Sequence, residues 1–167
     1  MNEGLSDGLK TSFPGTIPVH RPLIRDQEIR DPNWLAGFTS GEGSFMIKTR
    51  KSSAHGYSVL LVFKLSQHRR DLELMRKLAD YLDCGHYYPY LDAGDFTVTR
   101  ISDITDKIIP FFDRYPISGA KAKDFEGFKE ASVFIKSKAH LTKEGLDKIL
   151  LIKSRMNFKR ESIVSSI

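Results

Sequence analysis

The chain has 167 residues, of which 40% are hydrophobic and 28% charged, and this composition excludes a disordered chain and favours one folded domain. No run of 18 apolar residues occurs, which excludes a membrane-spanning helix, and the first residues do not resemble a secretory signal. A single cysteine, Cys84, excludes an internal disulfide and fits a reducing compartment.

The net charge is +5, and the positive charge is concentrated in two segments. Residues 44–70 contain six lysines or arginines and no acidic residue, and residues 121–160 contain 11 basic and 5 acidic residues. Both segments suit a polyanion such as nucleic acid, although for the second the preferred interpretation is a solvated helical face.

Residues 1–30 lack helical or strand periodicity and are rich in proline, so we expect an extended, linker-like segment. The sequence DPNWLAGFTSGEGS (31–44) follows, with Pro32 suited to the first position of a helix and Asp31 to its N-cap. We expect Gly43 to end this helix in a left-handed conformation. Gly37 and Gly41 share one face, which allows another backbone to approach closely.

Two hairpins separated by a helix are predicted next. Residues 44–50 and 57–66 alternate as two strands, and 68–82 has the apolar stripe of a helix that Cys84 and Gly85 end. Residues 86–91 and 95–101 form a second hairpin turned by residues 92–94, with Pro89 placing its strand at an edge. Helices are expected from Ser102, with a kink at Pro110, and over 121–138 and 142–157.

Leu35 to Gly43 (LAGFTSGEG) resembles the LAGLIDADG motif of homing endonucleases, with Glu42 at the acidic position. The resemblance extends over most of the chain and is greatest to the C-terminal half of a two-motif, single-chain enzyme of fungal mitochondrial type. It implies an α+β fold of the order αββαββα, with a four-stranded antiparallel saddle sheet and C-terminal helices. The expected domains are a linker at 1–30, a LAGLIDADG domain at 31–160 and a tail at 161–167.

The resemblance implies a site-specific, metal-dependent DNA endonuclease of the kind that acts in intron homing. Glu42 is then a catalytic residue and, with the Gly41 carbonyl, a ligand of Mg²⁺; we expect Mn²⁺ to substitute and Ca²⁺ to bind without cleavage. Lys121 matches a lysine near the scissile phosphate and Gln67 a polar residue of the outer water network. An ordinary surface lysine and a turn residue are the alternatives.

One carboxylate cannot hold a metal cluster, so we expect a second LAGLIDADG half to pack against Gly37 and Gly41, either as a homodimer or as a missing N-terminal half. The other partner is double-stranded DNA, and no membrane is involved. The expected DNA-binding residues are Ser44, Met46, Lys48, Arg50, Ser58, Lys64, Tyr88, Thr97 and Thr99. Alternatives are an RNA intron maturase and a non-cleaving DNA-binding fragment. The resemblance implies a mitochondrial location, or another reducing compartment.

Overall fold

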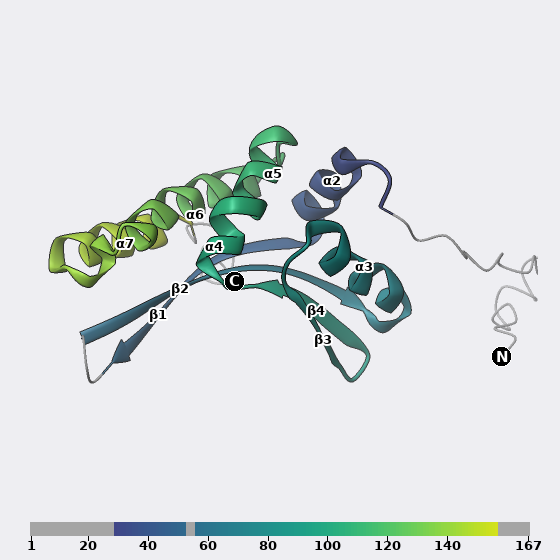
Figure 1. Cartoon of the computed structure of the whole chain (residues 1–167), viewed down its shortest axis with the longest axis horizontal. Coiled ribbons are helices and arrows are strands. Elements are labelled where there is room, and N and C mark those ends of the chain that lie inside the picture. The colour runs from purple at the N-terminus through teal and green to yellow at the C-terminus, as the bar shows by residue number, and fades with distance from the viewer. Residues whose placement is uncertain (1–28, 53–55, 157–167) are drawn as a thin grey trace, which may run out of the picture.

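A computed structural model of the chain describes residues 29–52 and 56–156. In this part, one four-stranded antiparallel sheet carries the helices on a single face (Figure 1). The elements are α2 (Pro32–Glu42), β1 (Gly43–Ser52), β2 (Gly56–His68), α3 (Leu72–Leu82), β3 (His86–Tyr90), β4 (Ala93–Val98), α4 (Ile101–Asp103), α5 (Ile109–Arg114), α6 (Ala120–Lys136) and α7 (Lys143–Met156). The predicted order αββαββα is confirmed. The predicted linker (1–30) and tail (161–167) lie outside the described residues, apart from residues 29 and 30.

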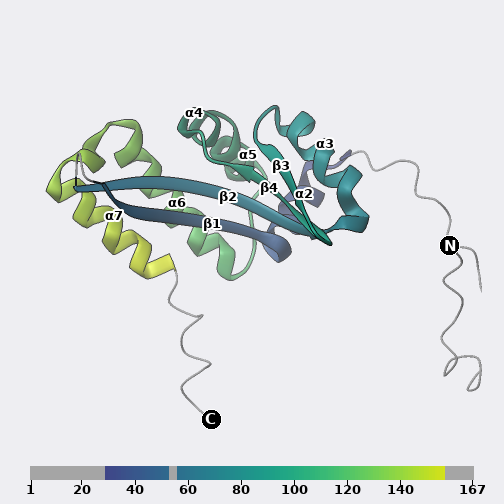
Figure 2. The ribbon, with the colours of Figure 1, turned by 90° about the horizontal axis from the view of Figure 1, so that it is seen from below.

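The strand order in the sheet is β1-β2-β4-β3, so the two hairpins join through their inner strands β2 and β4. Phe63 of β2 is the register partner of both Phe45 in β1 and Val98 in β4. The strand that holds Pro89 is an edge strand, as predicted. The sheet is strongly bent, and seen from the side away from the helices it presents an open, curved face (Figure 2).

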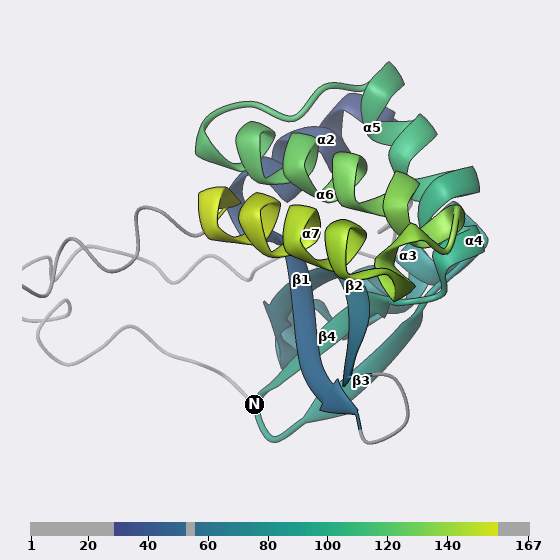
Figure 3. The same cartoon turned by 90° about the vertical axis from the view of Figure 1, so that its left-hand side faces the viewer.

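The core lies between the sheet and the helices and is built largely of phenylalanine. The Phe45 ring lies 5.0 to 5.8 Å, centroid to centroid, from the rings of Phe63, Phe112, Phe125 and Phe128. These contacts connect β1, β2, α5 and α6, and aromatic pairs at such distances add to the stabilisation from burial alone. Helix α6 runs alongside β1, with α7 packed against it (Figure 3).

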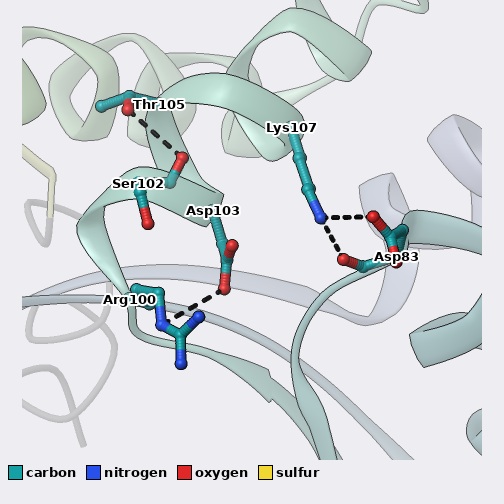
Figure 4. Close-up of polar contacts among 6 residues, drawn as sticks. All are labelled: Asp83, Arg100, Ser102, Asp103, Thr105 and Lys107. Carbon is teal, nitrogen blue, oxygen red and sulfur yellow. Dashed lines mark hydrogen bonds and ion pairs between the residues drawn. The ribbon is translucent and has the colours of Figure 1, made fainter.

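The helix predicted over 68–82 begins later than expected, because a 3₁₀ turn at Arg69–Asp71 precedes α3. Asp83 ends α3 in the left-handed conformation, with φ of 50°. The Lys107 ammonium bonds both the carboxylate of Asp83, at 2.6 Å, and its carbonyl oxygen (Figure 4). A cation at this position complements the negative end of the helix, so Lys107 fixes α3 to the next helical segment.

Pro110 was predicted to kink or shorten its helix, and the helix is not shortened there. The chain stays helical from Ile101 through a π-helical turn at Ile104–Ile108 into α5, and the Ile109 amide donates to the Ile104 carbonyl, five residues back. This shift of one residue in the hydrogen-bond register lets Pro110, which has no N–H, sit in the first turn of α5. The segment begins at Ile101, one residue before the predicted Ser102.

Candidate functional site

Glu42 is the last residue of α2, and its side chain is exposed. The start of the helix is as predicted: the Asp31 carboxylate accepts a hydrogen bond of 2.9 Å from the Asn33 amide, and Pro32 is the first helical residue. Leu35, Ala36 and Thr39 are buried, which anchors the helix in the core and leaves its final turn at the surface. The sequence therefore places one carboxylate in solvent at the junction of α2 and β1.

Gly43, which follows Glu42, has an extended conformation with φ of −73°, so the predicted left-handed end of the helix is wrong. The chain passes directly from α2 into β1. A Cβ atom at Gly43 would lie 2.5 Å from the Thr39 carbonyl oxygen and 2.5 Å from Thr39 Cγ2. Glycine is required here by the close approach of the helix and not by a positive φ.

The connection between α5 and α6 lies against the end of α2. The Lys121 ammonium donates to the Gly41 carbonyl, and the Ser118 amide donates to the Ser40 hydroxyl at 3.0 Å. The Ser40 hydroxyl in turn donates to the Ala36 carbonyl within the helix. Two residues separated by about 80 positions in the sequence are thus joined, and Lys121 lies at the carbonyl directly before Glu42. The sequence did not predict the Ser40 contact, because its partner is a loop amide.

The Gly41 carbonyl was predicted as a metal ligand, and in the structure it accepts from Lys121. Gln67 lies near the end of β2, two residues past the register partner of Gly43, and so at the same end of the sheet as Glu42. Its side-chain oxygen accepts a hydrogen bond of 3.1 Å from the His68 amide. Both Lys121 and Gln67 are near the junction of α2 and β1, and their catalytic roles stay predictions.

One face of α2 carries no packing partner within the described residues. Gly37 and Gly41 are exposed, and a Cβ atom built on either would have no neighbour within 4 Å. Trp34 and Phe38 stack beside them, with ring centroids 5.1 Å apart, and Trp34 is 42% exposed. Trp34 is exposed and Phe38 is partly buried against the core, and this aromatic pair with the two open glycines forms a surface suited to a closely approaching protein segment.

The face of the sheet away from the helices carries most of the predicted DNA-binding residues. By register, Ser44 is next to Lys64, which is next to Thr97; Met46 is next to Val62, and Arg50 next to Ser58. Lys48 and Arg50 are exposed at the far end of the hairpin. Tyr88, on the edge strand, is 56% exposed. These residues form what we call the concave face.

Thr99 lies one residue beyond the end of β4 at Val98, so no strand register assigns it to the concave face, and its DNA-binding role stays a prediction. The predicted turn at residues 92–94 is wrong: Leu91 and Asp92 form it, and Ala93 and Gly94 are already in β4. This register adds four polar residues to the concave face that the sequence analysis missed, namely Ser66, His86, Tyr90 and Asp95. No sequence pattern indicates a turn at Leu91, because leucine rarely adopts the positive φ of 38° that it has here.

Two apolar residues of β2, Leu60 and Val62, lie on the concave face beside Lys48 and Met46. Val62 alternates with the core residues Leu61 and Phe63, yet it is only 3% exposed and does not join the main hydrophobic cluster. Val62 is therefore covered by neighbouring side chains of the concave face, whereas Leu60 is 45% exposed. Of the two apolar residues, only Leu60 is available to a ligand.

No group of three or more histidine, cysteine, aspartate or glutamate side chains with metal-binding geometry occurs in the described part of the chain. Glu42 thus offers one carboxylate, which alone does not complete the ligand shell of a divalent metal. Between residues 29 and 156, leaving out 53–55, no helix has both the length and the apolar character that a bilayer span requires.

Solved structures of DNA-bound proteins share this fold. The I-SmaMI LAGLIDADG homing endonuclease bound to cleaved DNA aligns with 96% of this chain and 55% of that chain, at 43% identity and a TM-score of 0.87. The I-LtrWI LAGLIDADG homing endonuclease bound to target DNA aligns with 94% and 54%, at 44% identity and a TM-score of 0.84. Fold and site together define a homing-endonuclease-like α+β domain.

The chain belongs to the LAGLIDADG endonuclease family, whose model matches residues 35–132. Probable intron-encoded endonuclease 2 of Neurospora crassa is 40% identical over 93% of this chain and 36% of its own length. Probable intron-encoded endonuclease 3 of the same fungus is 39% identical over 93% of this chain and 30% of its own length. The chain thus spans about a third of these relatives and about half of the solved chains, as expected of one half of a longer protein.

Proposed function

We propose that the chain is one half of a site-specific double-stranded DNA endonuclease, which hydrolyses phosphodiester bonds with Mg²⁺ and requires a second LAGLIDADG half. The observation that carries this proposal is the position of Glu42. Its carboxylate is exposed at the tip of α2, beside an ammonium group held by the preceding carbonyl. An acid and a cation at one exposed point suit the binding of a metal and of a phosphate next to it.

The donor set fits a hard divalent cation. Mg²⁺ prefers oxygen ligands in octahedral geometry and is usually held by one or two carboxylates, waters and substrate phosphates. Glu42 supplies one such oxygen, and the Gly41 carbonyl has a second lone pair besides the one that accepts from Lys121. Mg²⁺ bound here would neutralise charge on the phosphate and activate water. One relative, I-SmaMI, was solved on uncleaved target DNA in the presence of calcium ions, which supports our expectation for Ca²⁺.

The second half would dock on α2. Gly37, Gly41 and the stacked Trp34 and Phe38 form an open surface on the helix that ends in Glu42. Two such helices in contact bring two terminal acids to one place, which completes the ligand set that one chain lacks. A homodimer and a partner half in the same longer chain both satisfy this requirement; the partial coverage of the relatives favours the second.

DNA would lie along the concave face, whose exposed end carries Lys48 and Arg50. We also propose a mitochondrial location. The support is that related proteins are named as intron-encoded endonucleases of fungi, and that one is described from intron 1 of ND4 in Podospora anserina.

The test is cleavage by the Glu42→Gln variant. The chain, alone and with a candidate second half, is incubated with a library of randomised duplexes, and cleaved ends are sequenced. We expect cleavage in Mg²⁺ and binding without cleavage in Ca²⁺. Glu42→Gln should lower the rate by more than the roughly 10- to 100-fold that loss of an outer-shell metal partner costs, and should still bind DNA. Glu144→Gln, which neutralises an exposed acid on α7, is the control.

Two outcomes favour the alternatives. Sequence-specific binding without cleavage in any metal or with any second half would indicate a non-cleaving DNA-binding fragment. Preferential binding of structured intron RNA would indicate a maturase that uses the basic helices α6 and α7. The second is the weaker alternative, because Lys129 and Lys136 already pair with Asp113 and Asp106.

A further inference from the structure

A lysine and an aspartate form an ion pair on the concave face, where the two inner strands meet. Lys64 of β2 lies between Ser44 of β1 and Thr97 of β4 in the register, and its Nζ is 3.1 Å from Oδ2 of Asp95 in β4. The Lys64 side chain is 32% exposed and that of Asp95 is 20% exposed. The Lys64 side chain is therefore the more accessible member of the pair, and both residues lie in the inner strands of the sheet.

Further hydrogen bonds fix the carboxylate. The Tyr90 hydroxyl donates to Asp95 Oδ1 at 3.1 Å, and the Ser66 side chain also bonds this carboxylate. Burial raises the pKa of Asp95, but the hydrogen bonds from Ser66, Lys64 and Tyr90 outweigh it and hold the pKa below its usual value. A carboxylate has about four acceptor sites, and three are used, so Asp95 is ionised at neutral pH and held in one orientation.

The pair leaves a directed donor group on the surface. An ammonium has three N–H donors, and Asp95 takes one of them, so two stay available toward the concave side. In the DNA major groove, guanine presents two neighbouring acceptors, O6 and N7, which a lysine can bond. Because the charges of Lys64 and Asp95 cancel, the pair as a whole adds little to the attraction of phosphates.

We propose that Lys64 reads a guanine in the DNA target and that Asp95 is the positioning residue that orients it; this rests on the proposed function. The proposal separates Lys64 from Lys48 and Arg50. Those two lie on the same face and are exposed, and neither has a carboxylate partner among the described residues. They are suited to phosphates, which bind a mobile cation without requiring a fixed direction.

The experiment measures base preference and salt dependence together. The chain selects bound sequences from randomised duplexes, and each position of the selected site is then changed to all four base pairs. We expect one guanine whose replacement weakens binding by about tenfold or more. Lys64→Met should abolish that preference while leaving the preferences at other positions unchanged.

The Asp95→Asn variant tests the positioning role, and its effect on non-specific binding should be opposite to that of removing a lysine. It removes a negative charge and frees the lysine, so non-specific binding should tighten and the slope of log affinity against log salt should steepen by about one. The preference for the same guanine should fall. Lys48→Met is the matched control: it removes an equal charge from the same face, should flatten the slope by about one, and should leave that guanine preference intact.

Thermal melting of each variant shows whether the sheet is preserved. A preference for guanine that survives Lys64→Met, or a uniform loss at all positions, would overturn the inference and leave the proposed function standing. Failure to select any sequence would overturn both. An effect of both variants on melting temperature alone would show that the pair is only a cross-strand ion pair.

Discussion

At the scale of single residues, Gly43 shows how a small side chain determines the position of Glu42. The last turn of α2 lies so close to Gly43 that a methyl group added to this residue would meet the Thr39 carbonyl. Overpacking of this kind costs about 1–3 kcal/mol. We expect Gly43→Ala to lower the free energy of unfolding by this amount, measured by urea denaturation. An unchanged free energy would mean that α2 shifts freely on β1.

Cys84 is predicted to be an unreactive thiol. Burial, followed by repulsion from Asp103, raises its pKa from 9.0 to about 11. Because folding favours the neutral thiol, this contribution to stability is complete below about pH 9 and declines as the pH rises toward 11. At pH 8 we expect alkylation by iodoacetamide to be about a hundredfold slower in the folded than in the urea-unfolded chain. Equal rates would contradict this prediction.

At the scale of elements, α2 has two glycines, Gly37 and Gly41, at which an added Cβ atom would meet no neighbour within 4 Å. Glycine inside a helix is less stable than alanine by roughly 0.5–1 kcal/mol. We therefore expect Gly37→Ala to raise the melting temperature of the chain by about 1–4 °C.

The same variant should weaken association with a second half, because the added methyl group would separate the two helices. Sedimentation at several concentrations measures this effect. Substitution of an exposed residue on another helix, Ala120→Ser at the start of α6, is the control for a change of similar size. If Gly37→Ala left association intact, the open face of α2 would not be the contact surface.

The sequence was sufficient to predict most elements but not their junctions. Alternating apolar residues determined which face of β1 and β2 is buried, as Phe45, Ile47 and Phe63 show. The missed features depend on contacts between distant residues or on unusual local geometry. The turn at Leu91 and Asp92, the π-helical turn before Pro110 and the extended Gly43 are examples. The contact of Lys121 with Gly41 links distant parts of the chain, and only the resemblance had pointed to Lys121.

At the scale of the whole molecule, the chain contains half of the proposed metal site, so its activity should depend on its association state. We expect a purified chain that is monomeric at micromolar concentration to bind DNA weakly and to cleave it slowly. Light scattering with and without DNA checks this. If a homodimer is active instead, its selected site should be nearly palindromic, because a two-fold axis relates its halves. An asymmetric site from an active homodimer would contradict the proposal.

The edge strand β3 has a further consequence for assembly. A sheet can grow only where its border offers backbone donors, and Pro89 withdraws one N–H from the outer border of β3. Addition of a foreign strand, the first step of many aggregates, is thus discouraged at that border. The opposite border, formed by β1, has no proline in Gly43–Ser52. Strand exchange between copies, where it occurs, should begin there.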